Sequence, residues 1–280
     1  MMLRMRRRQG LVSAVGLVVL VTLLVAYTEH AFAHPPDDLC AADPTGCRSG
    51  IPRRDAPKPP AGEPVDIMHP ASSAPNTASA PANERSTFDT AVLYLRLGYT
   101  HILPLGLDHI LFVLALFLAS ASLRPLLIQI TSFTVAHTIT LALATLGIVQ
   151  APPSVIEPLI ALSIALVAIE NLFFSEITRW RPFIVFGFGL CHGLGFASAL
   201  TALGLPRSQF FPALISFNVG VEVGQLSVVA LAFVPAYLLR RLLKAEGRER
   251  LYRPIAVIPL SLLIGAIGAV WAYQRAFSGS

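Results

Sequence analysis

The chain has 280 residues, of which 54% are hydrophobic and only 13% are charged, and its formal net charge is +5 at pH 7. Soluble domains are about 45–50% apolar and about 25% charged, so this composition excludes an ordinary soluble protein and indicates a membrane protein. The positive charge does not indicate nucleic-acid binding, because no basic run is interleaved with aromatic residues. The three cysteines form no CxxC pair, which excludes cysteine as the main chemistry.

The first 33 residues have the features of a secretory signal peptide. An arginine-rich start is followed by an apolar stretch from Leu11 to Tyr27 and by Ala-Phe-Ala at residues 31–33, which fits the A-x-A cleavage pattern. We therefore expect residues 1–33 to be a signal peptide. An uncleaved anchor helix is the alternative, because the apolar stretch is longer than most signal cores.

Residues 34–87 are rich in proline, alanine and serine and contain few large apolar side chains. Such a segment cannot bury enough surface to offset the entropy of ordering, so we expect a disordered extracytoplasmic linker. That compartment is oxidising, so Cys40 and Cys47 are candidates for a disulfide. A metal-binding or unpaired role for these two cysteines stays open.

Six apolar segments in residues 88–280 are each long enough to cross about 30 Å of hydrocarbon as a helix. They follow a short amphipathic stretch, and we expect them at residues 101–120, 125–147, 153–174, 182–203, 209–239 and 254–273. The predicted fold class is therefore an all-α polytopic membrane helix bundle with six core transmembrane helices, preceded by a signal peptide and a disordered tail.

Basic residues between the predicted spans indicate an orientation. Arg124, Arg179, Arg181 and the segment 240–253, which has six Lys or Arg residues, fall on one side, whereas the opposite loops carry only Arg207. Cytoplasmic loops are enriched in Lys and Arg. We therefore expect a bacterial inner-membrane protein whose N-terminal tail and C-terminus are both extracytoplasmic.

Several ionisable side chains fall inside the apolar segments, where each costs at least about 2.5–3.5 kcal/mol and usually has a function. In the first span, Asp108 lies seven positions after His101, a step of two helical turns that would place both on one face of a continuous helix. His109 follows directly. His137 and His192 fall near the middle of the second and fourth spans.

The fifth span carries a polar face, because Asn218, Glu222 and Gln225 recur at helical spacing. In the second span, Thr134 and Thr138 flank the histidine, and their hydroxyl groups are candidates to orient its imidazole. We expect these residues to support a binding site rather than to bind directly, apart from the carboxylate of Glu222.

Some of these residues can also be explained by a purely structural role. A single buried histidine such as His192 more often forms a hydrogen bond between helices than binds a metal ion. Near the cytoplasmic end of the third span, Glu170 and Asn171 are as consistent with a structural role as with gating. The groups that together favour a functional site are Asp108, His109, His137 and Glu222.

Imidazole and carboxylate ligands together suit nickel, zinc, cobalt or iron(II), and they suit alkali ions poorly. We therefore predict an intramembrane site for a transported divalent metal ion, with the lipid bilayer as surroundings, no permanently bound cofactor and no catalysis. The predicted metal ligands are Asp108, His109, His137, Glu222, His192 and His101.

Five ordered motifs run through residues 98–225. They are GYTHILPLGLDHILF at 98–112, FTVAHTITL at 133–141, EPLIALS at 157–163 followed by EN at 170–171, FGLCHGLGFA at 188–197 and FNVGVEVGQ at 217–225. Together these motifs resemble the HupE/UreJ family of membrane proteins. The resemblance implies a nickel or cobalt permease that supplies hydrogenase or urease maturation, with metalloenzyme assembly factors among its partners.

Two other hypotheses use the same residues. An intramembrane zinc hydrolase would bind stoichiometric zinc tightly and activate water on it. A scaffold for metal handover would dock a soluble partner on the basic segment 240–253. The permease hypothesis instead predicts weakly bound metal and ion-dependent flux.

Overall fold

The computed structural model describes residues 86–120, 122–174, 179–202 and 207–277, and every regular element within these ranges is a helix. The expected all-α fold is thus confirmed for the described part of the chain. The predicted signal peptide, almost all of the predicted linker, and Cys40 and Cys47 lie outside the described residues.

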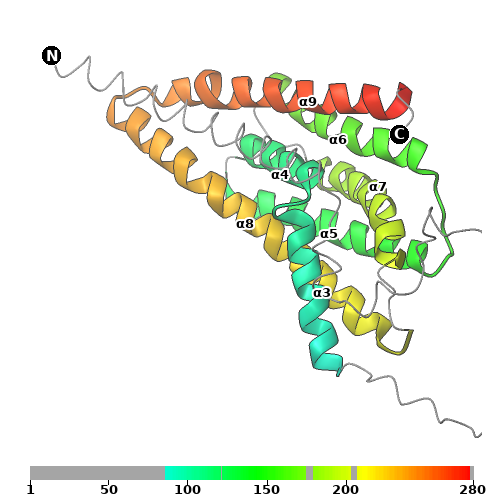
Figure 1. The fold of residues 1–280 in the computed structure, drawn as a ribbon. Helices are drawn as coiled ribbons and strands as arrows, with labels where there is room; N and C mark the ends of the chain where they lie inside the picture. The colour runs from blue at the N-terminus through cyan, green and yellow to red at the C-terminus, as the bar shows by residue number, and fades with distance from the viewer. Residues whose placement is uncertain (1–85, 121, 175–178, 203–206, 278–280) are drawn as a thin grey trace, which may run out of the picture. The chain divides into compact units, whose positions relative to one another are not determined.

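Long helices joined by short connections make up the described bundle (Figure 1). They are α3 (Thr87–Ile102), α4 (Leu107–Ala119), α5 (Leu123–Thr145), α6 (Pro153–Phe173), α7 (Arg181–Ala202), α8 (Phe210–Ala245) and α9 (Ile258–Phe277). Short 3-10 turns precede α8 and follow it, and a π-helical stretch, Arg253–Val257, leads into α9.

The first predicted span is broken rather than continuous. Residues 103–106 separate α3 from α4, and the two helices are bent by 69°. Pro104 has no amide hydrogen to continue the helix. Gly106 lies so close to the end of α3 that a Cβ there would clash with the carbonyl oxygen of His101. The expectation of one continuous helix with His101 and Asp108 on one face is therefore wrong.

The helices pack in close pairs, α5 with α7, α6 with α9 and α3 with α8. Small residues make this possible, as is usual between membrane helices. A Cβ added to Gly98 of α3, to Gly193 of α7 or to Gly268 of α9 would clash with the partner helix. The glycines of these interfaces therefore set how closely the helices approach.

α4 is the innermost helix of the described bundle. It contacts α5, α6, α8 and α9, and ten of its 13 residues are buried. A helix of this length is about 20 Å long, and one that is apolar on all sides belongs in a core. On its first turn, Leu107, His109 and Ile110 are consequently buried in protein.

Within the described residues, four helices are long and apolar enough to cross a membrane, and the bent pair of α3 and α4 adds a fifth if it counts as one span. The apolar part of α7, Arg181–Ala197, is shorter. Many large hydrophobic side chains face outward, such as Phe183 at 69% exposure. The membrane helix bundle is thus confirmed, whereas the count of six spans stays a prediction.

Candidate metal site

The break between α3 and α4 brings two histidines together. His101 lies in the last turn of α3, and His109 lies in the first turn of α4. In one continuous helix these residues would be about 12 Å apart along the axis, whereas their ring centroids are only 4.8 Å apart. The broken helix therefore creates a pair of imidazoles that helical periodicity alone would keep apart.

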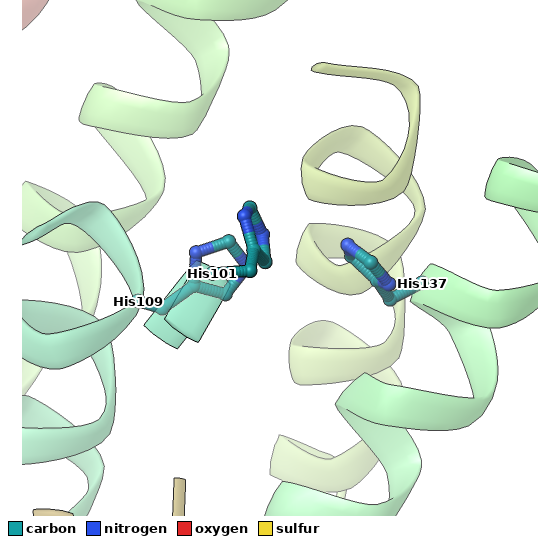
Figure 2. Close-up of side chains that lie close together, drawn as sticks. All are labelled: His101, His109 and His137. Carbon is teal, nitrogen blue, oxygen red and sulfur yellow. The ribbon is translucent and has the colours of Figure 1, made fainter. Parts of the chain in front are cut away.

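His137 of α5 completes a cluster of three imidazoles (Figure 2). One ring nitrogen from each of His101, His109 and His137 lies within 4.8 Å of the others. The Nε2 atoms of all three rings are buried, and none has a hydrogen-bond partner among the described residues. Because a buried polar atom without a partner costs free energy, this cluster is the candidate metal site.

His192 of α7 lies next to this cluster as a fourth imidazole. Its ring centroid is 4.9 Å from that of His109, and the side chain is only 1% exposed. Its Nδ1 atom is also buried and makes no hydrogen bond within the described part of the chain. The structure thus places all four histidines of the membrane domain in one region.

Two polar side chains contact the rings of this region. The Nδ1 atom of His137 is 3.2 Å from Oδ1 of Asn218, and Nε2 of His192 is 3.1 Å from Oγ of Ser163. Sequence reasoning predicted Asn218 as a supporting residue but missed Ser163. The one available signal was a serine at the end of the EPLIALS motif, in the otherwise apolar stretch 158–169.

Aromatic side chains surround the imidazoles. The ring of Phe196 is 3.9 Å from that of His101, and the rings of Phe133 and Phe112 are 4.9 Å and 5.4 Å from that of His192, measured between centroids. These rings fill the space that water would otherwise occupy, so the imidazoles sit in an apolar setting where an interaction with a cation is strengthened.

Asp108 is held by an ion pair with the last helix. Nη2 of Arg275 lies 3.1 Å from one carboxylate oxygen and 3.2 Å from the other, and both side chains are about one quarter exposed, at 26% and 27%. Asp108 is not one of the three residues whose ligand atoms converge. Arg275 follows the last predicted span in the sequence, and no local signal linked it to Asp108.

The predicted polar residues of α8 mostly face α5. Thr131 donates a hydrogen bond of 2.8 Å to Glu222, and Thr134 donates one of 3.0 Å to Gln225. The hydroxyl of Thr138 donates to the backbone carbonyl of Thr134 at 2.7 Å. Glu222 therefore lies at the α5–α8 contact, outside the three-histidine group, and Asn218 rather than a threonine contacts the imidazole of α5.

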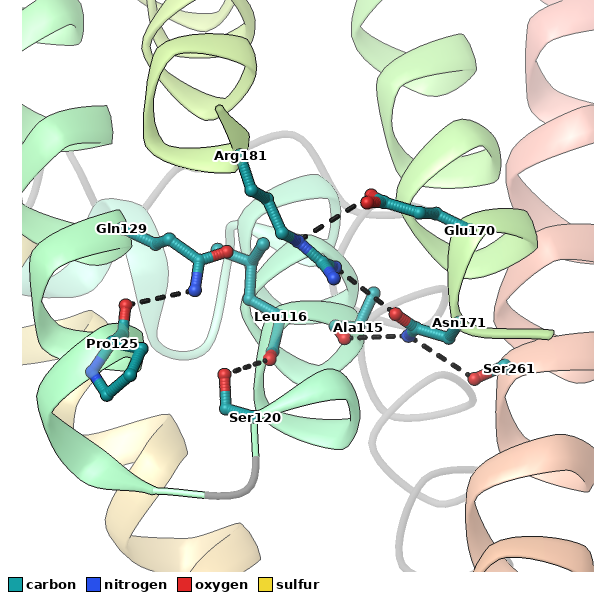
Figure 3. A network of polar contacts seen from close by, with 9 residues as sticks. All are labelled: Ala115, Leu116, Ser120, Pro125, Gln129, Glu170, Asn171, Arg181 and Ser261. Atoms are coloured by element: carbon teal, nitrogen blue, oxygen red, sulfur yellow. Dashed lines mark hydrogen bonds and ion pairs between the residues drawn. The ribbon is translucent and has the colours of Figure 1, made fainter. Parts of the chain in front are cut away.

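Glu170 and Asn171 belong to a separate polar network at the C-terminal end of α4 (Figure 3). The Asn171 amide accepts a 3.2 Å hydrogen bond from Arg181 and donates to the Ala115 carbonyl at 2.8 Å and to Ser261 at 3.4 Å. Glu170 lies 3.6 Å from Nε of Arg181. This network joins α4, α6, α7 and α9, whereas His109 lies at the opposite end of α4.

Comparison with known proteins finds a match to one family model and no match to an individual protein. A family model described as HupE / UreJ protein matches residues 77–275, which is more than half of the chain and includes every residue of the histidine cluster. No curated protein matches the chain, and no solved structure does.

Proposed function

The chain belongs to the HupE/UreJ family of membrane proteins, and from this premise we propose that it is a permease for a divalent transition metal ion. Nickel or cobalt is the cargo that the family suggests, and metalloenzyme maturation is the use. The observation that carries the proposal is the group of buried imidazole nitrogens without hydrogen-bond partners in the described bundle.

We assign the metal-binding role to His101, His109, His137 and His192. Imidazole suits nickel, zinc, copper and iron, and it is a poor ligand for alkaline-earth ions. Bonds between a metal and an imidazole nitrogen are about 2.0–2.1 Å long, so two nitrogens on one ion are at most about 4.2 Å apart. Since the three clustered nitrogens lie within 4.8 Å of one another, a small inward rotation of the rings is enough to bind an ion.

We propose that the carboxylates act on the approach of the cation rather than as direct ligands. Arg275 occupies both carboxylate oxygens of Asp108, and Glu222 accepts a hydrogen bond from Thr131. A site made only of neutral imidazoles holds a divalent ion less firmly than one with carboxylates, and permeation requires ligation weak enough for the ion to leave.

Flux into proteoliposomes tests this function. The purified protein is reconstituted, and the entry of Ni²⁺, Co²⁺, Zn²⁺ and Mn²⁺ is followed with an entrapped metal indicator. We expect flux of Ni²⁺ or Co²⁺ and a loss of at least about tenfold in His109→Ala or His137→Ala, since even residues that only support a metal ligand contribute this much to affinity.

The matched control is His69→Ala, which removes a histidine that precedes the described bundle and should leave flux unchanged. Equal flux in the wild type, His109→Ala and His137→Ala would contradict the proposal. Tightly bound stoichiometric zinc without flux would instead support the hydrolase hypothesis.

A further inference from the structure

Asn218 determines which nitrogen of His137 carries the proton. The Asn218 Nδ2 group donates a 2.8 Å hydrogen bond to the backbone carbonyl of Leu214, and this bond leaves Oδ1 as the atom that faces His137. An amide oxygen can only accept a hydrogen bond. The proton of the His137 ring therefore resides on Nδ1, and Nε2 carries no proton.

Ser163 determines the proton position on His192 by a similar argument. Its hydroxyl has a single hydrogen, which it donates to the backbone carbonyl of Ile160 at 2.7 Å. Its oxygen, 3.1 Å from Nε2 of His192, is then left to accept a hydrogen bond from that ring. The proton of His192 therefore resides on Nε2, and Nδ1 is bare.

We propose that Asn218 and Ser163 are positioning residues that fix these two opposite tautomers, so that His137 offers Nε2 and His192 offers Nδ1 to the metal ion. A neutral imidazole has one lone pair, on the nitrogen without the proton. The two nitrogens with this lone pair are the same two that are buried and unpartnered in the described structure. The role of the tautomers in metal binding rests on the proposed function. The tautomers themselves are a property of the metal-free protein and can be tested without it.

The opposite tautomers also suit the close packing of α5 and α7. Gly193 follows His192, and a Cβ there would clash with the backbone carbonyl of His137. Nδ1 is the ring nitrogen nearer to its own backbone, so His192 can bind an ion that lies close to α7. The longer reach of Nε2 suits His137, whose other nitrogen is directed toward α8 by Asn218.

Nuclear magnetic resonance of the metal-free protein tests the inference directly. The ring nitrogens are labelled with ¹⁵N, and their couplings to the carbon-bound ring protons identify the tautomer of each histidine. We expect a proton on Nδ1 of His137 and on Nε2 of His192. Asn218→Leu and Ser163→Ala should each convert the affected ring to the other tautomer or to a mixture.

Metal affinity is measured on the same samples with Ni²⁺ and Co²⁺. We expect Asn218→Leu and Ser163→Ala to weaken binding roughly 10–100-fold, as the loss of a group that orients a ligand does. Asn218→Asp should restore both the tautomer and most of the affinity, because a carboxylate oxygen also accepts a hydrogen bond. Ser261→Ala is the matched control, since it removes a buried serine hydroxyl that contacts Asn171 and lies outside the histidine cluster.

The inference is overturned if wild-type His137 or His192 shows the opposite tautomer. It is also overturned if Asn218→Leu and Ser163→Ala keep wild-type tautomers and bind metal as well as Ser261→Ala does. If the wild type shows the expected tautomers but binds none of the metals, the proposed function fails, whereas the assignment of Asn218 and Ser163 as tautomer-fixing residues is supported.

Discussion

At the scale of single residues, the imidazoles of the cluster and of the neighbouring His192 are held unequally. His137 and His192 each have a hydrogen-bonding partner, whereas His101 and His109 rest against the aromatic rings of Phe196 and Phe133. Among the described residues, ring contacts are what hold these two imidazoles, and a ring held in this way loses little when it rotates. We therefore expect His101 and His109 to make the larger adjustment when an ion enters the cluster.

The ion pair of Asp108 leads to a prediction that distinguishes direct binding of the metal ion by Asp108 from an indirect effect through Arg275. If Asp108 acts through Arg275, then Asp108→Asn and Arg275→Gln should reduce metal flux by similar factors, and the double variant should be no worse than either single one. Residues in direct contact show such non-additive behaviour. Initial flux rates in proteoliposomes measure it, and additive losses would mean that Asp108 also binds the ion itself.

The residues that sequence reasoning identified are those whose burial is costly. Ionisable groups in apolar segments stand out because a membrane rarely tolerates them, and this criterion selected the three histidines of the cluster and the neighbouring His192. It did not select Ser163, since the hydroxyl of a serine in a membrane helix can donate to a carbonyl of the same helix at little cost. It also could not pair Asp108 with Arg275, which lies 167 positions later in the chain.

At the scale of helices, the break between α3 and α4 is the feature that a periodicity argument cannot supply. Proline occurs inside continuous membrane helices, so Pro104 alone did not predict an end to the helix. The structure shows that Gly106 also contributes, because the chain there packs against the carbonyl of His101 where a Cβ would clash. Sequence patterns located the apolar segments but not the bend of 69° that assembles the cluster.

The contact between α5 and α7 gives a prediction about stability. In Gly193→Ala the new methyl group would clash with the His137 carbonyl and the Thr140 hydroxyl. Overpacking of this kind costs about 1–3 kcal/mol, and we expect metal affinity to fall as well because His137 must shift. The free energy of unfolding in detergent, followed by circular dichroism, measures the first effect.

Gly187→Ala is the matched control on the same helix, because a Cβ at Gly187 has no neighbour within 4 Å among the described residues. Helix propensity should make this variant as stable as the wild type or up to about 1 kcal/mol more stable. Equal stability of the two alanine variants would show that the close approach of α5 and α7 is not tight at Gly193.

At the scale of the whole molecule, the basic residues give a prediction about topology. We expect Lys244 to be cytoplasmic and Arg207 to be extracytoplasmic, by the excess of Lys and Arg in cytoplasmic loops. In a background without native cysteines, Arg207→Cys should react with an impermeant maleimide in intact spheroplasts. Lys244→Cys should react only after permeabilisation, and labelling of Lys244→Cys in intact spheroplasts would reverse the orientation.

The broken helix has an electrostatic consequence for an ion in the histidine cluster. The peptide dipoles of a helix sum to about half a negative charge at its C-terminus, and His101 lies in the last turn of α3. The opposing positive end of α4 carries Asp108 in its first turn, where the carboxylate is paired with Arg275. Discontinuous helices of membrane transporters bind cations at such ends, so we expect the negative end of the α3 dipole to add to the attraction that neutral imidazoles exert on a cation.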